Sequence, residues 1–404
     1  MLKAYKYKLL PDEEQTTLLN KHFGSIRFIY NHFLNERKVE YETNDNTLNY
    51  YDNAKVLTII KKSDEYIWLK EVNSQSLQYS LKCLDGAYQN FFKFKKGFPK
   101  FKSKHNKNSF TVPQFVKVID DYINIPKFKN GIKMIKHRDF KGDIRSCTIS
   151  KTATNEYFVS ILVETTHNVL PKTGKSVGID LGIKDFVITS NGYKYKNNRY
   201  TKTYAKLLKE KQQHLSRKTK NSNRYKNQKL KVASTHKKIT NSRLDNLHKV
   251  STDLIRKYDV IVLEDLNIKG MIKNHKLSKH IADASWGKLI ELLTYKAEWN
   301  DKTIVKIDRF FPSSKTCNCC GYINQNLTLS MRTWVCPSCN TKLDRDLNAS
   351  INILKEGYKI ISSGTDDYRR GDEIRPAKAG TIRETSKIQN LVSEAHPIAY
   401  GVGG

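Results

Sequence analysis

Residues 176–195 read SVGIDLGIKDFVITSNGYKY and carry the pattern that decides the fold of the larger part of this chain. The first apolar run predicts a buried strand with Asp180 inside it. A second apolar run follows Gly182 and ends at a Ser-Asn-Gly turn, which is typical of a hairpin. Further on, YDVIVLEDL at 258–266 predicts a central strand that is covered on both faces. Helical patterns lie on both sides of it, so the order of elements indicates an α/β domain.

The segments before residue 176 have a different character. LKAYKYKL at 2–9 alternates as a strand does, Pro11 opens a helix with acids in its first turn, and 74–96 predicts a second long helix. From 109 to 165 the sequence alternates and is rich in Val, Ile, Tyr and Phe. This part predicts a small antiparallel barrel or sheet, which the first strand could complete.

The charge of the chain indicates its class of partner. Among 404 residues, 72 are Lys or Arg and 40 are Asp or Glu, which gives a formal charge of +32. Such self-repulsion predicts a polyanionic partner, and nucleic acid is the first candidate because each neutralised phosphate releases a counterion. A membrane surface is the second, but no apolar run approaches about 18 residues and the first residues lack a signal peptide's apolar core. We therefore expect a cytoplasmic protein that does not bind membranes.

Five of the seven cysteines lie between residues 317 and 339. Two Cys-x2-Cys pairs predict a tetrahedral, structural zinc site with the ligands Cys317, Cys320, Cys336 and Cys339. Gly321 and Asn340 follow the pairs and tolerate the left-handed backbone that such turns often need. Cys319 could compete as a ligand, but only Cys320 leaves two residues after Cys317. The alternative is a chance cluster of free thiols.

Three acids have positions that an ordinary surface charge would not take. Asp180 lies within an apolar strand, where an unpaired carboxylate is costly, and Glu264 ends VIVLE, where α/β folds place their sites. In DRDLNASINIL at 344–354, Asp346 shares a helix face with small residues, whereas Asp344 suits the N-cap. Three converging carboxylates would hold two Mg²⁺ or Mn²⁺ ions, and a pair of such ions can catalyse the hydrolysis of a phosphodiester. The alternative is that these acids only cap helices and end strands.

Several of these motifs resemble the TnpB (OrfB) proteins of bacterial insertion sequences. The resemblance rests on GIDLGIKDFVITSNG, IVLEDL, SSKTCNCCG, WVCPSC and DRDLNAS, with support from FKKGFPKFKSK and NSRLDNLHK. It runs from the first strand to about residue 356, and more weakly through RRGDEIRP. TnpB proteins are RNA-guided DNA endonucleases with a RuvC-like nuclease domain of the RNase H fold, related to type V CRISPR effectors. The resemblance implies that Asp180, Glu264 and Asp346 are the three catalytic RuvC carboxylates.

The resemblance also implies a domain organisation. It comprises a wedge β-barrel (1–10 and 109–170), a helical recognition module (11–108), a RuvC-like nuclease domain (171–312 and 346–361) and an inserted zinc element (313–345). We expect the polar tail at 362–404 to be disordered.

Candidate nucleic-acid contacts lie in the N-terminal part. Residues 91–107 interleave phenylalanines with seven lysines, which predicts phosphate contacts by residues that include Lys93, Lys95, Lys96, Lys100 and Lys102. The aromatics either stack on bases or only pin the segment. Gln75, Gln78 and Lys82 share the polar face of the helix at 74–96 and have side chains that can read bases, although a solvated helix face is the simpler explanation for any one of them.

The leading functional hypothesis is therefore an RNA-guided, metal-dependent DNA endonuclease of a prokaryotic transposable element, acting at the nucleoid. It would use a guide RNA from the same element and cut double-stranded DNA, with one strand displaced, next to a short transposon-associated motif. A miniature type V CRISPR effector is the runner-up with the same chemistry. A catalytically silent, zinc-bearing regulator that binds nucleic acid is the alternative from another class.

Overall fold

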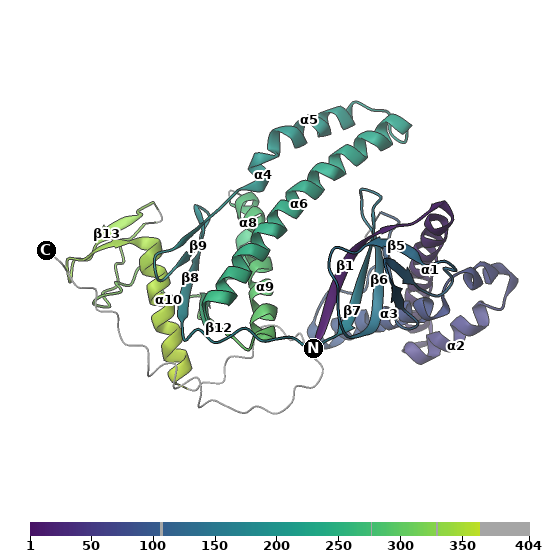
Figure 1. Cartoon of the computed structure of the whole chain (residues 1–404), viewed down its shortest axis with the longest axis horizontal. Coiled ribbons are helices and arrows are strands. Elements are labelled where there is room, and N and C mark those ends of the chain that lie inside the picture. The colour runs from purple at the N-terminus through teal and green to yellow at the C-terminus, as the bar shows by residue number, and fades with distance from the viewer. Residues whose placement is uncertain (106–107, 276, 329, 364–404) are drawn as a thin grey trace. The chain divides into compact units, whose positions relative to one another are not determined.

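A computed structural model describes residues 1–105, 108–275, 277–328 and 330–363 (Figure 1). The chain divides into two compact units, Met1–His167 and Asn168–Gly404. From residue 364 on, the tail that we expected to be disordered lies outside the described residues. None of the helices in the described ranges combines the length and the apolar character that a membrane crossing needs.

The first unit contains a seven-stranded antiparallel sheet (Figure 1). In spatial order its strands are β2 (Asn108–Val112), β6 (Asp143–Lys151), β7 (Tyr157–Glu164), β1 (Leu2–Leu10), β5 (Ile132–Ile135), β4 (Tyr122–Asn124) and β3 (Lys117–Ile119). The first strand of the chain lies in the middle, between β7 and β5, which confirms that it completes the sheet. In the described part of the chain, the outer strands β2 and β3 do not pair with each other, so closure into a barrel is not confirmed.

Helices fill the sequence between β1 and β2. They are α1 (Glu13–Asn44), α2 (Tyr50–Ile60), the 3₁₀ helix η1 (Asp64–Glu71) and α3 (Ser74–Phe94). The sequence predicts that Pro11 opens this helix, but α1 begins two residues later, at Glu13. Asp12 is instead its N-cap and accepts a 2.8 Å hydrogen bond from the Gln15 amide, while the Gln15 side chain bonds back to the Asp12 amide. The predicted helix at 74–96 is α3, and it ends where Lys95 turns left-handed.

The second unit has a mixed five-stranded sheet (Figure 1). In spatial order its strands are β10 (Lys194–Lys196), β9 (Asp185–Thr189), β8 (Ser176–Leu181), β11 (Val260–Glu264) and β12 (Thr303–Ile307). Strand β9 is antiparallel to both of its neighbours, whereas β8, β11 and β12 are parallel. The hairpin, the central strand and the α/β character that the sequence predicts are all confirmed.

The helices of the second unit lie on both faces of this sheet or project beyond it. They are α4 (Tyr200–Thr203), α5 (Ala205–Ser216), α6 (Asn223–Lys257), α7 (Ile268–Ile272), α8 (Ser278–Ala284), α9 (Trp286–Trp299) and α10 (Arg345–Ser362). Ile261 and Leu263 of β11 pack in one core with α6 and α9. Val260 and Val262 point the other way and pack in a second core with α10. The alternation follows from the two-residue period of a strand and explains why VIVLE is apolar throughout.

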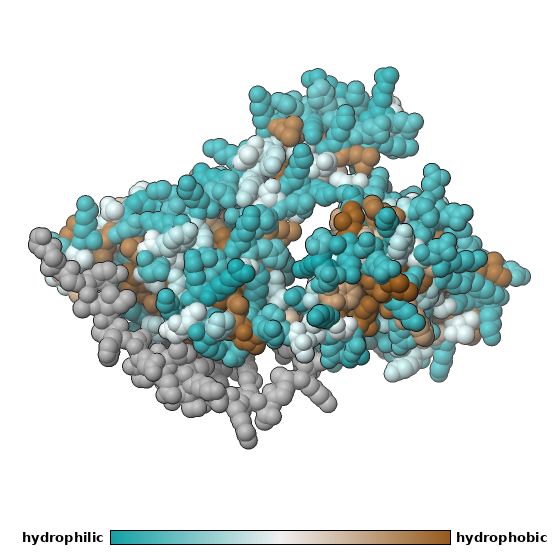
Figure 2. All heavy atoms as spheres, in the orientation of Figure 1, coloured by the Kyte–Doolittle hydropathy of each residue, from teal (hydrophilic) through white to brown (hydrophobic). Residues whose placement is uncertain are grey.

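The basic segment 201–257 is not one continuous helix. Helix α5 turns back at 217–222 and lies along the first part of α6, where the Gln228 side chain donates a 2.9 Å hydrogen bond to the Lys211 carbonyl. Figure 1 shows this hairpin projecting from the second unit, and Figure 2 shows that its visible surface is mostly hydrophilic, with small apolar patches.

Two glycines allow α10 to lie directly on the sheet. A Cβ atom at Gly178 in β8 would lie 2.2 Å from the Ser350 carbonyl oxygen. At Gly357 in α10, a Cβ would lie 2.5 Å from the Val262 side chain. The charge of Asp346, at the start of α10, acts on Asp180 near the carboxyl end of β8. The contact between α10 and the sheet positions Asp346.

Candidate active site and cysteine cluster

The three predicted acids lie on one face of the second unit's sheet. Asp180 is the fifth residue of β8, and Glu264 is the last residue of β11. The parallel register pairs Leu263 with Ile179, so Glu264 continues it beside Asp180. Both acids alternate with residues that face α6 and α9, and they therefore point to the α10 side. Asp346 is the second residue of α10 and shares that side.

The electrostatics of Asp180 show that the acids influence one another. Asp180 is half-buried, and the pKa of its carboxyl group is raised to about 7, with burial as the largest cause. The negative charges of Glu264 and Asp346 contribute to this rise, whereas the Leu181 amide opposes the change. Burial and the neighbouring negative charges disfavour the ionised form of Asp180, so a bound cation would be favoured at this place.

The Glu264 carboxylate has a close partner in Ser313. The Ser313 hydroxyl donates a 2.5 Å hydrogen bond to its Oε1 atom. Burial raises the pKa of Glu264, and the Ser313 hydrogen bond opposes that rise.

Asp346 is held by two arginines. Arg332 Nη1 lies 2.9 Å from Oδ2, and Arg345 Nη2 lies 3.0 Å from Oδ1. Asp344 has the capping role that the sequence predicts, because its carboxylate accepts hydrogen bonds from the amides of Asp346 and Leu347 at 3.0 and 3.1 Å. The structure thus assigns the cap to Asp344, while the charge of Asp346 is close enough to Asp180 to raise its pKa.

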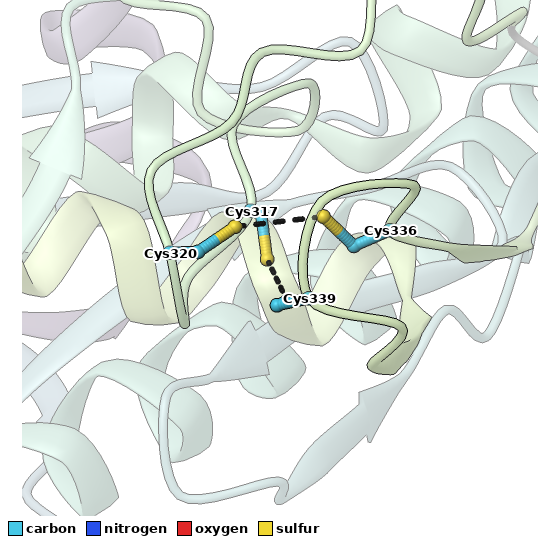
Figure 3. A group of neighbouring side chains, drawn as sticks. All are labelled: Cys317, Cys320, Cys336 and Cys339. Atoms are coloured by element: carbon cyan, nitrogen blue, oxygen red, sulfur yellow. Dashed lines mark hydrogen bonds between the residues drawn. The ribbon is translucent and has the colours of Figure 1, made fainter.

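The cysteine cluster is more tightly assembled than the acids. The ligand atoms of Cys317, Cys320, Cys336 and Cys339 all lie within 4.8 Å of one another (Figure 3). Among the described residues, this is the only group of three or more Cys, His, Asp or Glu side chains gathered closely enough to hold a metal ion. The acids share a face, but the structure does not bring their oxygen atoms into such a group.

The two Cys-x2-Cys turns have matching backbones. The Gly321 amide donates to the Cys317 carbonyl at 3.0 Å, and the Asn340 amide donates to the Cys336 carbonyl at 2.8 Å. Gly321 and Asn340 have φ angles of 81° and 57°, which confirms the predicted left-handed positions. Donation from the Thr341 hydroxyl and amide lowers the pKa of Cys339 to about 6, and such donation favours the thiolate that binds metals.

Cys319 stays outside this group. It is exposed, and its thiol donates a 3.2 Å hydrogen bond to Asn318 Oδ1. The structure therefore selects Cys320, as the spacing predicts.

The predicted nucleic-acid contacts lie in differing environments. The exposed candidates are Gln78, Lys82, Lys93, Lys95, Lys96 and Lys100. Gln75 is half-buried and donates to the Gln114 side chain at 2.9 Å. Lys102 is also half-buried, with its Nζ atom 3.7 Å from the centre of the Tyr30 ring. Phe98 packs edge-on against Tyr88 and Phe91, so part of this segment is pinned as the second interpretation expected.

Sequence reasoning missed four residues around the acids, namely Ser313, Arg332, Asn348 and Asn352. Both asparagines are buried, with 1% and 4% of their surface exposed. A signal was present, because a soluble helix seldom places two amides four residues apart on a buried face without partners for them.

Comparisons with known proteins agree with this architecture. Three family models match: a "Helix-turn-helix domain" at 1–46, a "Probable transposase" at 159–284 and a "Cas12f1-like, TNB domain" at 286–353. Among solved structures, the chain is similar to Cas12f1 in its complex with sgRNA and target DNA. The TM-score is 0.54 at 14% identity, over 85% of this chain and 83% of that one. This similarity concerns the fold.

Two relatives match almost end to end. A Streptomyces pristinaespiralis protein named "Putative RNA-guided DNA endonuclease" is 34% identical over 96% of this chain and 95% of its own length. An Escherichia coli K12 protein named "Putative RNA-guided DNA endonuclease InsQ" is 30% identical over 90% of this chain and 94% of its own. By this full-length similarity, and by the OrfB model that its centre matches, the chain belongs to the TnpB (OrfB) family.

Proposed function

We propose that this chain is an RNA-guided, metal-dependent DNA endonuclease encoded by a transposable element. The observation that carries this function is the 34% identity, over nearly the whole of both chains, to the relative named "Putative RNA-guided DNA endonuclease". The three acids on one sheet face supply the chemistry that such an enzyme needs. Its substrate places it at the nucleoid, in the cytoplasm of a prokaryote.

Asp180, Glu264 and Asp346 would hold the catalytic cations. The set consists of hard oxygen donors, which Mg²⁺ and Mn²⁺ prefer, and the negative charges of Glu264 and Asp346 add to the raised pKa of Asp180, an effect that a bound cation would offset. Two bound Mg²⁺ ions would activate the attacking water and stabilise the leaving oxygen of the phosphodiester. The chain's own task is to place the three carboxylates on one face and to move Asp346 from its arginine partners to the cation.

The four cysteines would hold a structural Zn²⁺ ion. Four thiolates leave no open position for water, and their turns have the paired backbone hydrogen bonds described above. This cluster and the residues around it form the inserted element at 313–345. The nuclease domain would then comprise 171–312 and 346–361, and the first unit would supply the wedge and recognition modules.

The basic surface would bind a guide RNA and the target DNA. The α5–α6 hairpin adds a projecting, hydrophilic arm rich in lysine and arginine (Figure 2). The exposed lysines of 93–100 add phosphate contacts in the first unit. Gln78 and Lys82 lie exposed on α3, where they would read the motif beside the target.

The decisive experiment measures cleavage with and without RNA. Protein purified from its host should carry an RNA, and sequencing should place that RNA at the end of its own element. RNA-free protein should bind DNA with strong salt dependence and little selectivity. Added guide RNA should confer cutting at matching sites, and a scrambled guide should confer none. Site-specific cutting by rigorously RNA-free protein would contradict RNA guidance.

Two alternatives differ from this proposal in specific ways. A miniature type V effector has the same chemistry but would lie beside a repeat array in the genome. A silent regulator would have no reason to keep all three acids, and mutating them would leave its activity unchanged.

A further inference from the structure

A short segment joins the cysteine cluster to the acids. We call Ser313–Asn318 the strap. It contains the first cysteine of the cluster, Cys317, and begins with the residue that contacts Glu264. Ser313 is buried, with 6% of its surface exposed, and its hydroxyl lies 2.5 Å from Glu264 Oε1.

One face of α10 holds the strap in place. Asn352 Nδ2 donates to the carbonyl oxygens of Ser313 and Thr316, at 2.8 and 2.6 Å. Asn348 Nδ2 donates to the Thr316 carbonyl at 2.7 Å, and its Oδ1 accepts from the Asn318 amide at 2.9 Å. Buried amides are costly unless they are hydrogen-bonded, so the strap accounts for both asparagines.

The strap therefore has a fixed middle and two functional ends. At one end, the Ser313 hydroxyl donates to one oxygen of Glu264, and the other oxygen would bind the cation. At the other end, Cys317 is held among three more cysteines. Groups that hold the ligands of a metal in place commonly contribute 10- to 100-fold in metal affinity.

We propose that Ser313 is a positioning residue for Glu264, and that the strap makes cation affinity at the acids depend on an intact cysteine cluster. This inference rests on the proposed role of Asp180, Glu264 and Asp346 as cation ligands. Ser313 orients Glu264, and the cysteine cluster limits the movement of Ser313.

The first test measures Mn²⁺ binding by electron paramagnetic resonance on the full chain, with the binding of a Glu264→Gln variant as background. Ser313→Ala should raise the apparent dissociation constant about 10- to 100-fold, whereas Ser313→Thr, which keeps the hydroxyl, should restore most of the affinity. The neighbouring Ser314→Ala is the matched control, because Ser314 contacts Asn348 through its backbone carbonyl. Unchanged Mn²⁺ affinity in a folded Ser313→Ala variant would overturn the proposal.

The second test is a double-mutant cycle with Cys320→Ser, a change at an exposed cysteine of the cluster. This change should weaken Mn²⁺ binding about 10-fold in the wild-type chain and less than about 2-fold in Ser313→Ala, because the connection is already broken. Fully additive effects would show that the two centres are independent and would overturn the coupling. Guided cleavage is measured separately, so a chain that shows the coupling but cuts no DNA would refute the proposed function alone.

Discussion

The cysteine cluster and the three acids lie in the same unit, yet their side chains are assembled to different degrees. The four sulfur atoms lie within 4.8 Å of one another, and their turns are fixed by backbone hydrogen bonds. The acids share a sheet face, but Asp346 is bonded to two arginines and Glu264 to Ser313. Local sequence builds the first site, because short turns set its geometry. The second depends on two parallel strands and a helix that are distant in the sequence.

This difference has a physical reason in the charge of the ligands. Four thiols can approach one another while they are protonated, whereas ionised carboxylates repel one another until a cation neutralises them. The cysteine cluster should therefore govern folding, and the acids should govern catalysis. The predictions below test that division.

The largest effect should come from replacing Asp346, which lies two residues after the N-cap Asp344 at the start of α10. Asp346→Ala should lower guided DNA cleavage about a thousand-fold or more while leaving DNA binding intact, because the cations act in the transition state. Asp180→Ala and Glu264→Ala should do the same. Asp344→Ala is the matched control, and loss of this cap should cost about 1 kcal/mol of stability. Cleavage by Asp346→Ala but not by Asp344→Ala would reverse the assignment.

The next effect separates two cysteines of the same segment. The wild-type protein should bind one zinc ion per chain, and Cys336→Ser should lower that occupancy. The same change should lower the free energy of unfolding by more than about 4 kcal/mol, because metal binding is coupled to folding. Cys319→Ser should change neither quantity measurably, since Cys319 is exposed and lies outside the cluster. Elemental analysis and thermal denaturation measure the two. If the wild-type protein had the same free energy of unfolding with and without zinc, the cluster would have no structural role.

A smaller effect tests how closely α10 must lie on the sheet. Gly357→Ala should destabilise the second unit by about 1–3 kcal/mol, because its Cβ would meet Val262. Gly86→Ala in α3 is the matched helical control and should stabilise by about 0.5–1 kcal/mol, since nothing lies within 4 Å of its Cβ. Chemical denaturation measures both. Equal stabilisation by the two changes would show that the close contact of α10 is unnecessary.

The smallest effect concerns the pH dependence of the metal-free protein. The pKa of Asp180 is raised to about 7, above its ordinary value, so the folded state binds this proton more tightly than the unfolded state does. Stability should fall as the pH rises from about 4 to 7, and the loss should be complete above that range. At pH 8, without added divalent cations, Asp180→Asn should therefore melt about 2–4 °C higher than the wild type.

Added Mg²⁺ should stabilise the wild-type protein at pH 8 and should have little effect on Asp180→Asn. A variant that melts lower than the wild type at pH 8 would show that the Asp180 charge is well compensated without a metal.

The sequence predicts the local features of this molecule well. The hairpin after Asp180, the buried central strand, the Asp344 cap and the two left-handed turns of the cysteine cluster all follow from short-range rules, and the structure confirms them. These rules concern residues within a few positions of one another. The choice of Cys320 over Cys319 belongs to the same class.

Longer-range features were not predictable in this way. No periodicity shows that Ser313 meets Glu264, because 49 residues separate them and the contact depends on where α10 lies. The partners of Asn348 and Asn352 are backbone carbonyls, which leave no pattern in the sequence. Closure of the first unit's sheet into a barrel also depends on strand tilt and shear, which residue alternation does not specify.

The central position of β1 has a consequence for synthesis on the ribosome. Leu2 pairs with Glu164, so the strand that is made first waits for one of the last strands of its unit. At about 5–20 residues per second, β1 remains unpaired for roughly 6–25 s, until its other partner β5 has been translated. During that time, Tyr5, Tyr7 and Leu9, which are buried in the finished sheet, are exposed on a nascent chain. Lys6 and Lys8, which alternate with them, and Lys3, which precedes them, provide charge that opposes aggregation until the sheet forms.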